Sequence, residues 1–251
     1  MKETDGQGFS LGRVEEALNV WGFPDRPWHL GTVLGHPVDL NPRTMVFTWV
    51  TMAVVLLLGW LAARGADVRR PGRVAALFEL AWDLVRGLVR ESMDPAKGRG
   101  LTMVMMTCLV FITVANLLGI VPAMFAPTAD HQTTFALAGI TFVLTQAYGL
   151  RYHGLGYFGR FLKPFPVLLP LRLIEELSRP LTLAFRLFGN MQGKEIMIFA
   201  LLGLITGTAE IAGGFLASVA WLAFSVFISF IQAFVFTVLS IAYIAMAVED
   251  D

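Results

Sequence analysis

Pro180–Met197 has the sequence PLTLAFRLFGNMQGKEIM and places charged side chains inside a stretch that otherwise has the pattern of a membrane-embedded helix. Arg186 is the most informative of these residues. A guanidinium stays charged in protein, and holding it at bilayer depth costs from about 2.5 to more than 10 kcal/mol. Such residues usually line a polar pathway or face a charge on another subunit. We therefore expect this stretch to be the functional centre of the chain.

The composition indicates a polytopic membrane protein. The 251 residues are 56% hydrophobic and only 15% charged, with a mean hydropathy of +0.66, whereas soluble domains carry about 25% charged residues. The 19 basic and 19 acidic residues balance, so no nucleic-acid partner is predicted. The chain has one cysteine, Cys108, and no Cys/His spacing typical of zinc or haem sites. We therefore expect no metal and no cofactor.

Residues 1–42 are predicted to form an external N-terminal segment, followed by a single membrane domain over residues 43–251. Pro24, Pro27 and Pro42 interrupt any long helix here, although Leu11–Trp21 has the pattern of a short amphipathic one. The start lacks the basic region and early apolar core of a cleaved signal peptide, so we take it as part of the mature protein.

Three uncharged stretches are long enough to cross the bilayer: Met45–Ala63, Leu101–Ala126 and Thr133–Leu150. Several arginines or lysines follow the first and the third, whereas residues 127–132 between the second and the third contain none. By the positive-inside rule, this pattern places the N-terminus outside and the basic loops in the cytoplasm.

Val74–Ser92 has a different pattern, with apolar residues at helical spacing on one side and charged residues on the other. The pattern favours a helix that lies along the cytoplasmic membrane surface. A soluble helix packed on a partner protein has the same pattern, so this alternative stays open.

Leu171–Thr206 and Phe215–Ala247 predict two long helices, with a turn at Gly213 and Gly214 and a kink at Pro180. The second stretch would reach about 50 Å, well beyond a hydrocarbon core of about 30 Å. We therefore expect a tilted hairpin that packs across the side of a large partner, and a C-terminus in the cytoplasm. The predicted fold is an all-α integral membrane protein with about five membrane-embedded helices and one interfacial helix.

Helical geometry gathers polar residues on the face of Arg186. At 100° per residue, Asn190 and Thr182 lie about 40° to either side of it. Three residues toward the cytoplasmic end fall within about 80° of it: Glu175, Ser178 and Arg179. They predict a polar stripe that leads from the cytoplasm to Arg186.

Glu195 lies about 180° from Arg186 and nearer the external end of the helix. A polar stripe on one side and a separate acid on the other predict two half-channels that do not join. Ser225 and Gln232 lie seven residues apart on one face of the last helix, where they could complete the external half-channel.

The segments SRPLTLAFRLFGNMQGKEI and FISFIQAFVFTVLSIAYIAMA, together with NLLGIVP at Asn116–Pro122, resemble subunit a of the F-type ATP synthase membrane sector, the ATPase subunit 6 family. The resemblance extends from the first transmembrane helix to the C-terminus. The combination of RLFGN with IQAFVF is specific to that family.

The resemblance implies that Arg186 is the essential arginine facing the ion-carrying carboxylate of a rotating c-ring, and that Asn190, Glu195 and Gln232 line the ion paths. It also implies a non-catalytic, multi-pass subunit of a bacterial plasma membrane complex that couples ion flow to ATP synthesis. The implied partners are the c-ring, subunit b of the stator, membrane lipid and, indirectly, the F1 catalytic sector.

Two residues depart from the family pattern. Lys194 stands where many members have a small or acidic residue, and Ser225 where some have a histidine. Lys194 has two interpretations: it tunes the ionisation of Glu195 or acts as a gate, or its side chain snorkels to the membrane surface. Asn116, on the second uncharged stretch, is a further candidate for the ion pathway.

Two other classes of function were weighed. A secondary ion transporter or channel would explain buried charges, but transporters usually contain two similar halves, and no internal repeat is visible. An intramembrane enzyme would need a nucleophile, base or metal cluster, and the four histidines all lie outside the uncharged stretches. The chain has no P-loop pattern, so phosphate chemistry would take place on partner subunits. The choice between H⁺ and Na⁺ stays open.

Overall fold

The computed structural model describes residues 28–33, 36–65, 72–98, 100–121, 124–154, 156–159, 167, 169–203 and 210–249. Several side chains inside these ranges, that of Glu195 among them, are not described. The amphipathic helix predicted at Leu11–Trp21 lies outside the described residues.

The described part of the chain contains six long helices. They are α2 (Pro42–Arg64), α3 (Arg73–Ser92), α4 (Leu101–Leu118), α5 (His131–His153), α7 (Leu169–Gly203) and α8 (Glu210–Val248), with two short elements, η1 (Pro127–Ala129) and α6 (Gly156–Gly159). Helices α2, α4, α5 and the Phe215–Val248 part of α8 are long and apolar enough to cross a membrane. The prediction of a helical membrane protein is therefore confirmed, while the number of embedded helices stays a prediction.

A β-hairpin precedes α2, which the sequence analysis did not predict. Strand β1 (Trp28–Val33) pairs antiparallel with β2 (His36–Leu40), and the register shifts between His29 and Gly31. The hairpin lies between Pro27 and Pro42, which the sequence analysis used as evidence against a long helix. Pro37 lies inside β2, which is possible because both strands of a two-stranded sheet are edge strands.

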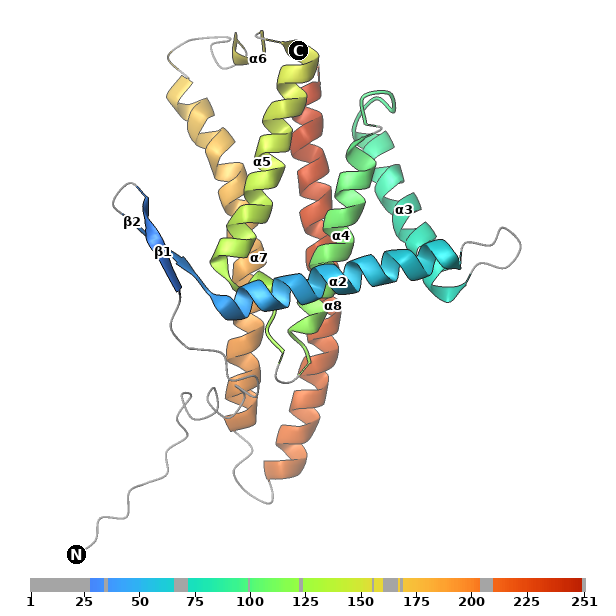
Figure 1. The fold of residues 1–251 in the computed structure, drawn as a ribbon, viewed down its shortest axis with the longest axis vertical. Helices are drawn as coiled ribbons and strands as arrows, with labels where there is room; N and C mark the ends of the chain where they lie inside the picture. Colours follow the sequence, from blue (N-terminus) through green and yellow to red (C-terminus); the bar gives the residue numbers. More distant parts are fainter. Residues whose placement is uncertain are drawn as a thin grey trace, which may run out of the picture.

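Helices α4, α5, α7 and α8 lie side by side, and α2 crosses them at a large angle (Figure 1). Helices α7 and α8 run antiparallel and extend beyond their neighbours at one end (Figure 1). Their 35 and 39 residues correspond to about 52 and 58 Å. The predicted long hairpin is therefore present, although its packing against a partner stays a prediction.

Two predicted boundaries were wrong. Gly213 and Gly214 do not form a turn but lie inside α8, since glycine weakens a helix by only about 1 kcal/mol per residue. Helix α4 ends at Leu118 instead of Ala126, because the chain folds back so tightly that a Cβ atom on Gly119 would collide with Ala126. Pro180 lies inside α7, as predicted, and the kink expected there stays a prediction.

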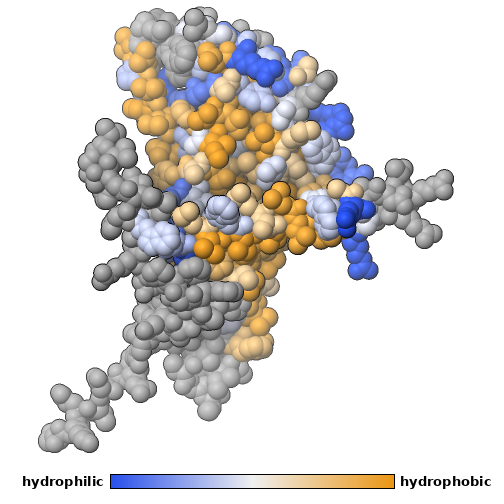
Figure 2. Space-filling view, in the orientation of Figure 1, coloured by the Kyte–Doolittle hydropathy of each residue, from blue (hydrophilic) through white to orange (hydrophobic). Residues whose placement is uncertain are grey.

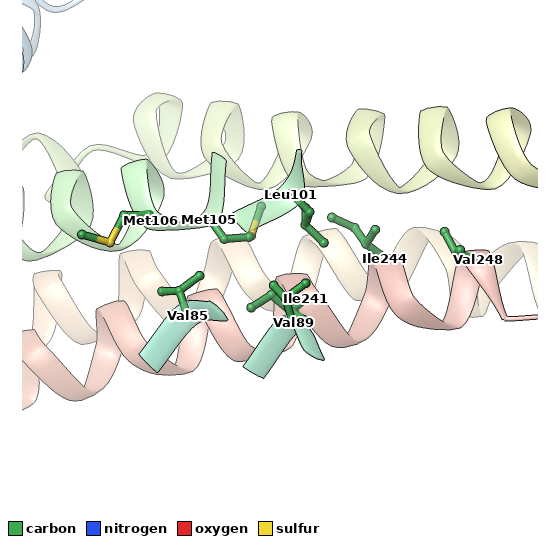
Figure 3. Close-up of a cluster of buried hydrophobic side chains, with 8 residues drawn as sticks. All are labelled: Val85, Val89, Leu101, Met105, Met106, Ile241, Ile244 and Val248. Carbon is green, nitrogen blue, oxygen red and sulfur yellow. The ribbon is translucent and has the colours of Figure 1, made fainter. Parts of the chain in front are cut away.

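The largest core cluster joins α3, α4 and α8 (Figure 3). Val85 and Val89 of α3 pack against Leu101 and Met105 of α4 and against three residues of α8: Ile241, Ile244 and Val248. Apart from this contact, α3 exposes leucines on its other face. The predicted helix is confirmed, and its position on a membrane surface stays a prediction.

Helix α2 packs on α4 through Phe47, Val114 and Leu118, but most of its large apolar side chains are exposed. Figure 2 shows hydrophobic residues along α2 and over the middle of the bundle, and hydrophilic residues mainly at the top of the view and at the right-hand end of α2. An extended apolar surface of this kind is expected for a protein surrounded by lipid.

A buried hydrogen bond fixes the start of α2. Thr44 Oγ1 donates to Asp130 Oδ2 at 2.5 Å, and Asp130 Oδ1 accepts from the backbone N–H of Gln132 and so caps α5. Both Thr44 and Asp130 are buried. The contact therefore connects α2 to the first turn of α5.

We expect Thr44→Val to lower the free energy of unfolding by about 1–3 kcal/mol, because it leaves a buried carboxyl oxygen without its donor. The thermal unfolding midpoint of the detergent-solubilised protein would measure this. Thr48→Val is the matched control, since Thr48 Oγ1 donates only to the backbone oxygen of Thr44 in its own helix. Equal midpoints for the two variants would contradict a role for the Thr44–Asp130 contact.

Candidate functional site

The predicted polar stripe is present on the outer face of α7. Five of its members are exposed, namely Glu175, Ser178, Thr182, Arg186 and Asn190, and the sixth, Arg179, is half-buried. The hydroxyl groups of Ser178 and Thr182 donate to backbone oxygens one turn earlier in the same helix, at 2.8 Å each. These two hydroxyl groups therefore need no other helix of this chain as a partner.

Arg186 lies in the middle of α7 on this outer face. The structure gives it no hydrogen bond or ion pair within the residues that it describes. Its neighbours Phe185 and Leu181 are large, apolar and exposed. A permanent positive charge is thus exposed on the polar stripe, with large apolar side chains beside it.

A second polar region lies on the inner side of α7, where this helix faces α8. We name it the external polar seam: Asn190 and Lys194 of α7, Ser225, Ser229 and Gln232 of α8, Asn116 of α4 and Thr128 of η1. Asn190 Nδ2 donates to Gln232 Oε1. Lys194 Nζ lies 2.9 Å from Ser229 Oγ and 3.5 Å from the backbone oxygen of Ser225. The seam therefore joins α7 to α8 by polar contacts.

Lys194 is buried, with only 7% of its surface exposed. Its ammonium group contacts Ser229 and Ser225 of α8, an arrangement that disfavours the snorkelling interpretation. The side chain of Glu195 lies outside the described residues, so the tuning of Glu195 by Lys194 stays a prediction.

Asn116 connects the seam to α4 and η1. It is fully buried, accepts from Thr128 Oγ1 at 2.7 Å and donates to the backbone oxygen of Ser229 at 3.4 Å. Two polar atoms of the seam, Ser225 Oγ and Gln232 Nε2, are buried and have no hydrogen-bond partner among the described residues. Most buried polar atoms in proteins are paired, so these two are unusual.

A third polar region lies at the opposite end of the α7–α8 pair. Here a cavity of about 360 Å³ is lined by charged residues of α7 and by the end of α8: Arg172, Glu175, Glu176, Arg179 and Glu249, together with Tyr157, Met246 and Ala247. Arg179 forms ion pairs with Glu175 at 2.7 Å and with Glu176 at 3.4 Å. Gln146 Nε2 of α5 donates to Glu176 Oε1 at 2.7 Å.

An apolar cluster separates these two inner regions. We name it the inner apolar plug: Ile112, Ala138, Leu183, Ala184, Leu187, Ala233 and Phe236. Its residues come from α4, α5, α7 and α8, and each of these side chains is at most 2% exposed. The inner side of α7 therefore carries polar contacts at both ends and closely packed apolar side chains between them.

Sequence reasoning missed several members of these regions. Ser229 lies four residues after Ser225 and three before Gln232, and this helical spacing could have identified it. Glu176 and Gln146 gave no comparable signal, because their pairing depends on how α5 packs on α7. Among the described residues, no group of three or more His, Cys, Asp or Glu side chains is placed to hold a metal ion.

Residues 45–245 match the family model described as ATP synthase A chain. The chain is 44% identical over 241 residues to ATP synthase subunit a of Desulforamulus reducens, covering 94% of this chain and 90% of the relative. It is 34% identical over 224 residues to ATP synthase subunit a of Lysinibacillus sphaericus, with 85% and 94% covered. It is 38% identical over 207 residues to ATP synthase subunit a 2 of Syntrophotalea carbinolica, with 81% and 84% covered.

The family model covers most of the described helices, including the outer stripe, the external polar seam and the inner apolar plug. The resemblance noted from RLFGN and IQAFVF is thereby confirmed. The chain belongs to the ATP synthase A chain family.

Proposed function

We propose that the chain is the ion-conducting stator subunit of a rotary ATP synthase, with two offset half-channels that carry H⁺ or Na⁺ to and from carboxylates on a c-ring. The proposal rests above all on Arg186, an exposed charge in the middle of an otherwise membrane-like helix, with no partner in the described chain. Burying such a charge against lipid alone is costly. A partner subunit with an acidic group would stabilise it.

The mechanism follows from the free energy of the ring carboxylate. A carboxylate that crosses lipid must be neutral, because its ionised form would cost several kcal/mol there. Beside Arg186 and a hydrated path, the ionised form is favoured, so the ion leaves. The ring then moves on, and the empty site is loaded again from the other half-channel before it returns to lipid.

We assign the polar regions at the two ends of the α7–α8 pair to the two half-channels. The external polar seam with Asn190, Lys194 and Gln232 would serve the external one, together with Glu195. Unpaired polar atoms such as Gln232 Nε2 and Ser225 Oγ can bind a chain of water molecules. The outer stripe of Glu175, Ser178 and Thr182 and the cavity beside it would serve the cytoplasmic one.

The assembly follows from the same assignment. The outer face of α7 would contact the c-ring, and subunit b would hold the chain in the stator, so that ion flow reaches the F1 catalytic sector only through rotation. The chain would itself catalyse no reaction. We place it in a bacterial plasma membrane with residues 1–42 outside and the C-terminus in the cytoplasm.

A secondary ion transporter or channel is the alternative function. It would use the polar seam without needing a partner for Arg186. Because Arg186 is exposed instead of lining the inner seam, the rotary function is favoured.

We expect Arg186→Ala to abolish ATP-driven ion pumping by the assembled complex in inverted membrane vesicles, because the ring carboxylate would no longer be favoured in its ionised form beside this subunit. Pumping is followed with a pH-sensitive dye and with radioactive Na⁺. Arg151→Ala, at the exposed end of α5, should pump normally. Intact pumping by Arg186→Ala would contradict the rotary function.

We expect Gln232→Leu to lower ion-driven ATP synthesis about tenfold or more, which is about 1.4 kcal/mol on the barrier. Leucine has about the volume of glutamine, so the substitution mainly removes the amide oxygen that accepts a hydrogen bond from Asn190. Thr237→Val is the control on the same helix, since Thr237 is buried and its hydroxyl donates only to the backbone oxygen of Ala233. The rate is measured per assembled complex, and equal loss in both variants would exclude Gln232 from the pathway.

A further inference from the structure

We propose that the inner apolar plug is the barrier that keeps the two half-channels apart on the inner side of α7. This inference rests on the proposed function, since only a chain with two half-channels needs such a barrier. A continuous polar path between them would let ions cross the membrane without turning the ring. Some feature of the molecule must therefore interrupt it.

Arg186 does not fill the space between the helices, because its side chain is exposed on the outer face of α7. Arg186 is exposed, whereas Leu187, the next residue, is fully buried against α8 and belongs to the plug. Successive residues on a helix point about 100° apart. The charge of Arg186 therefore faces a ring, and the space between the helices is filled by other side chains.

The order of residues is the same on both long helices. On α8, Gln232 of the external seam is followed by Ala233 and Phe236 of the plug and then by Ser240, whose Oγ lies 3.4 Å from Thr141 Oγ1 of α5. Gln232 and Ser240 are eight residues apart, which is about 12 Å along the helix.

On α7, Asn190 of the seam is followed, toward the start of the helix, by Leu187 and Leu183 of the plug and then by the ion-paired Arg179. Helix α4 repeats the pattern with Asn116 in the seam and Ile112 in the plug. Three helices thus change from polar to apolar at the same level, which indicates a barrier layer across the inner side of the subunit.

The packing of the plug explains how it would insulate. Leu187, Phe236 and Ile112 are 0% exposed. Water enters a protein interior only where polar partners and sufficient room are present, and a tightly packed apolar cluster has neither. An ion that crossed this layer would lose its hydration without compensation, at a cost of several kcal/mol or more.

The test measures passive ion leak through the whole complex. Inverted vesicles carry the assembled synthase with a non-hydrolysable ATP analogue bound to its catalytic sector, so that the ring cannot turn. A potassium diffusion potential drives the flux, which is followed as H⁺ and as Na⁺. We expect Phe236→Asn to raise the leak about tenfold or more over the wild type, equivalent to about 1.4 kcal/mol on the barrier.

Phe234→Asn is the matched control. Phe234 lies two residues away on the same helix, but it is 39% exposed and lies outside the plug. Its leak should stay at the wild-type level. Ile112→Thr is a milder second variant, which places a hydroxyl group in the plug from α4. We expect it to raise the leak as well, and it keeps the test decisive if the Phe236→Asn complex does not assemble.

The inference is overturned if Ile112→Thr and any assembled Phe236→Asn complexes leak no more than Phe234→Asn while the wild-type complex pumps ions normally. That result would leave the proposed function intact. Failure of the proposed function has a different signature, namely a wild-type complex without ATP-driven pumping or an Arg186→Ala complex that pumps.

Discussion

The free energy of placing polar groups inside hydrocarbon constrains the whole arrangement of this chain. Helix α7 carries amide and charged side chains along its length, and neighbouring helices supply partners for those on its inner side. Lys194 meets Ser229 of α8, and Glu176 meets Gln146 of α5. Arg186 is different because no such partner lies within the described chain. The fold thus pairs several of the inner polar groups within the described chain and leaves Arg186 exposed on the outer face.

The antiparallel α7–α8 pair gives these polar groups their positions. Since the two helices run in opposite directions, Asn190 and Lys194 meet Gln232 and Ser229 toward one end, and the opposite end forms the charged cavity around Arg179. At about 52 and 58 Å, the two helices are longer than a hydrocarbon core of about 30 Å. This length gives room for both polar regions and for the apolar cluster between them.

Sequence reasoning succeeded where a single helix determines the outcome. Uncharged runs predicted α2 and α5 to within three residues at each end, and the 100° period placed Arg186 and Thr182 on one exposed face. Sequence reasoning failed where the position of a residue depends on contacts between segments that are distant in the sequence. The burial of Lys194 depends on the position of α8, and the early end of α4 depends on the close approach of Ala126 to Gly119. Glu175 and Glu176 are adjacent in the sequence and have the same side chain, but the hydrogen bond from Gln146 of α5 is made to Glu176.

The two barriers that we assign to this subunit differ in chemistry because they face different surroundings. The outer face of α7 would contact a moving ring, whose carboxylate must be attracted, ionised and released, and a fixed positive charge such as Arg186 can do this. The inner face contacts helices of the same chain that need not move, so close apolar packing is sufficient there and introduces no buried charge that needs compensation. A charged residue in place of Leu187 would destabilise the core. A leucine in place of Arg186 would remove the positive charge that we propose for the ring carboxylate. On our proposal, one turn of α7 would therefore separate ions by electrostatics on one side and by exclusion of water on the other.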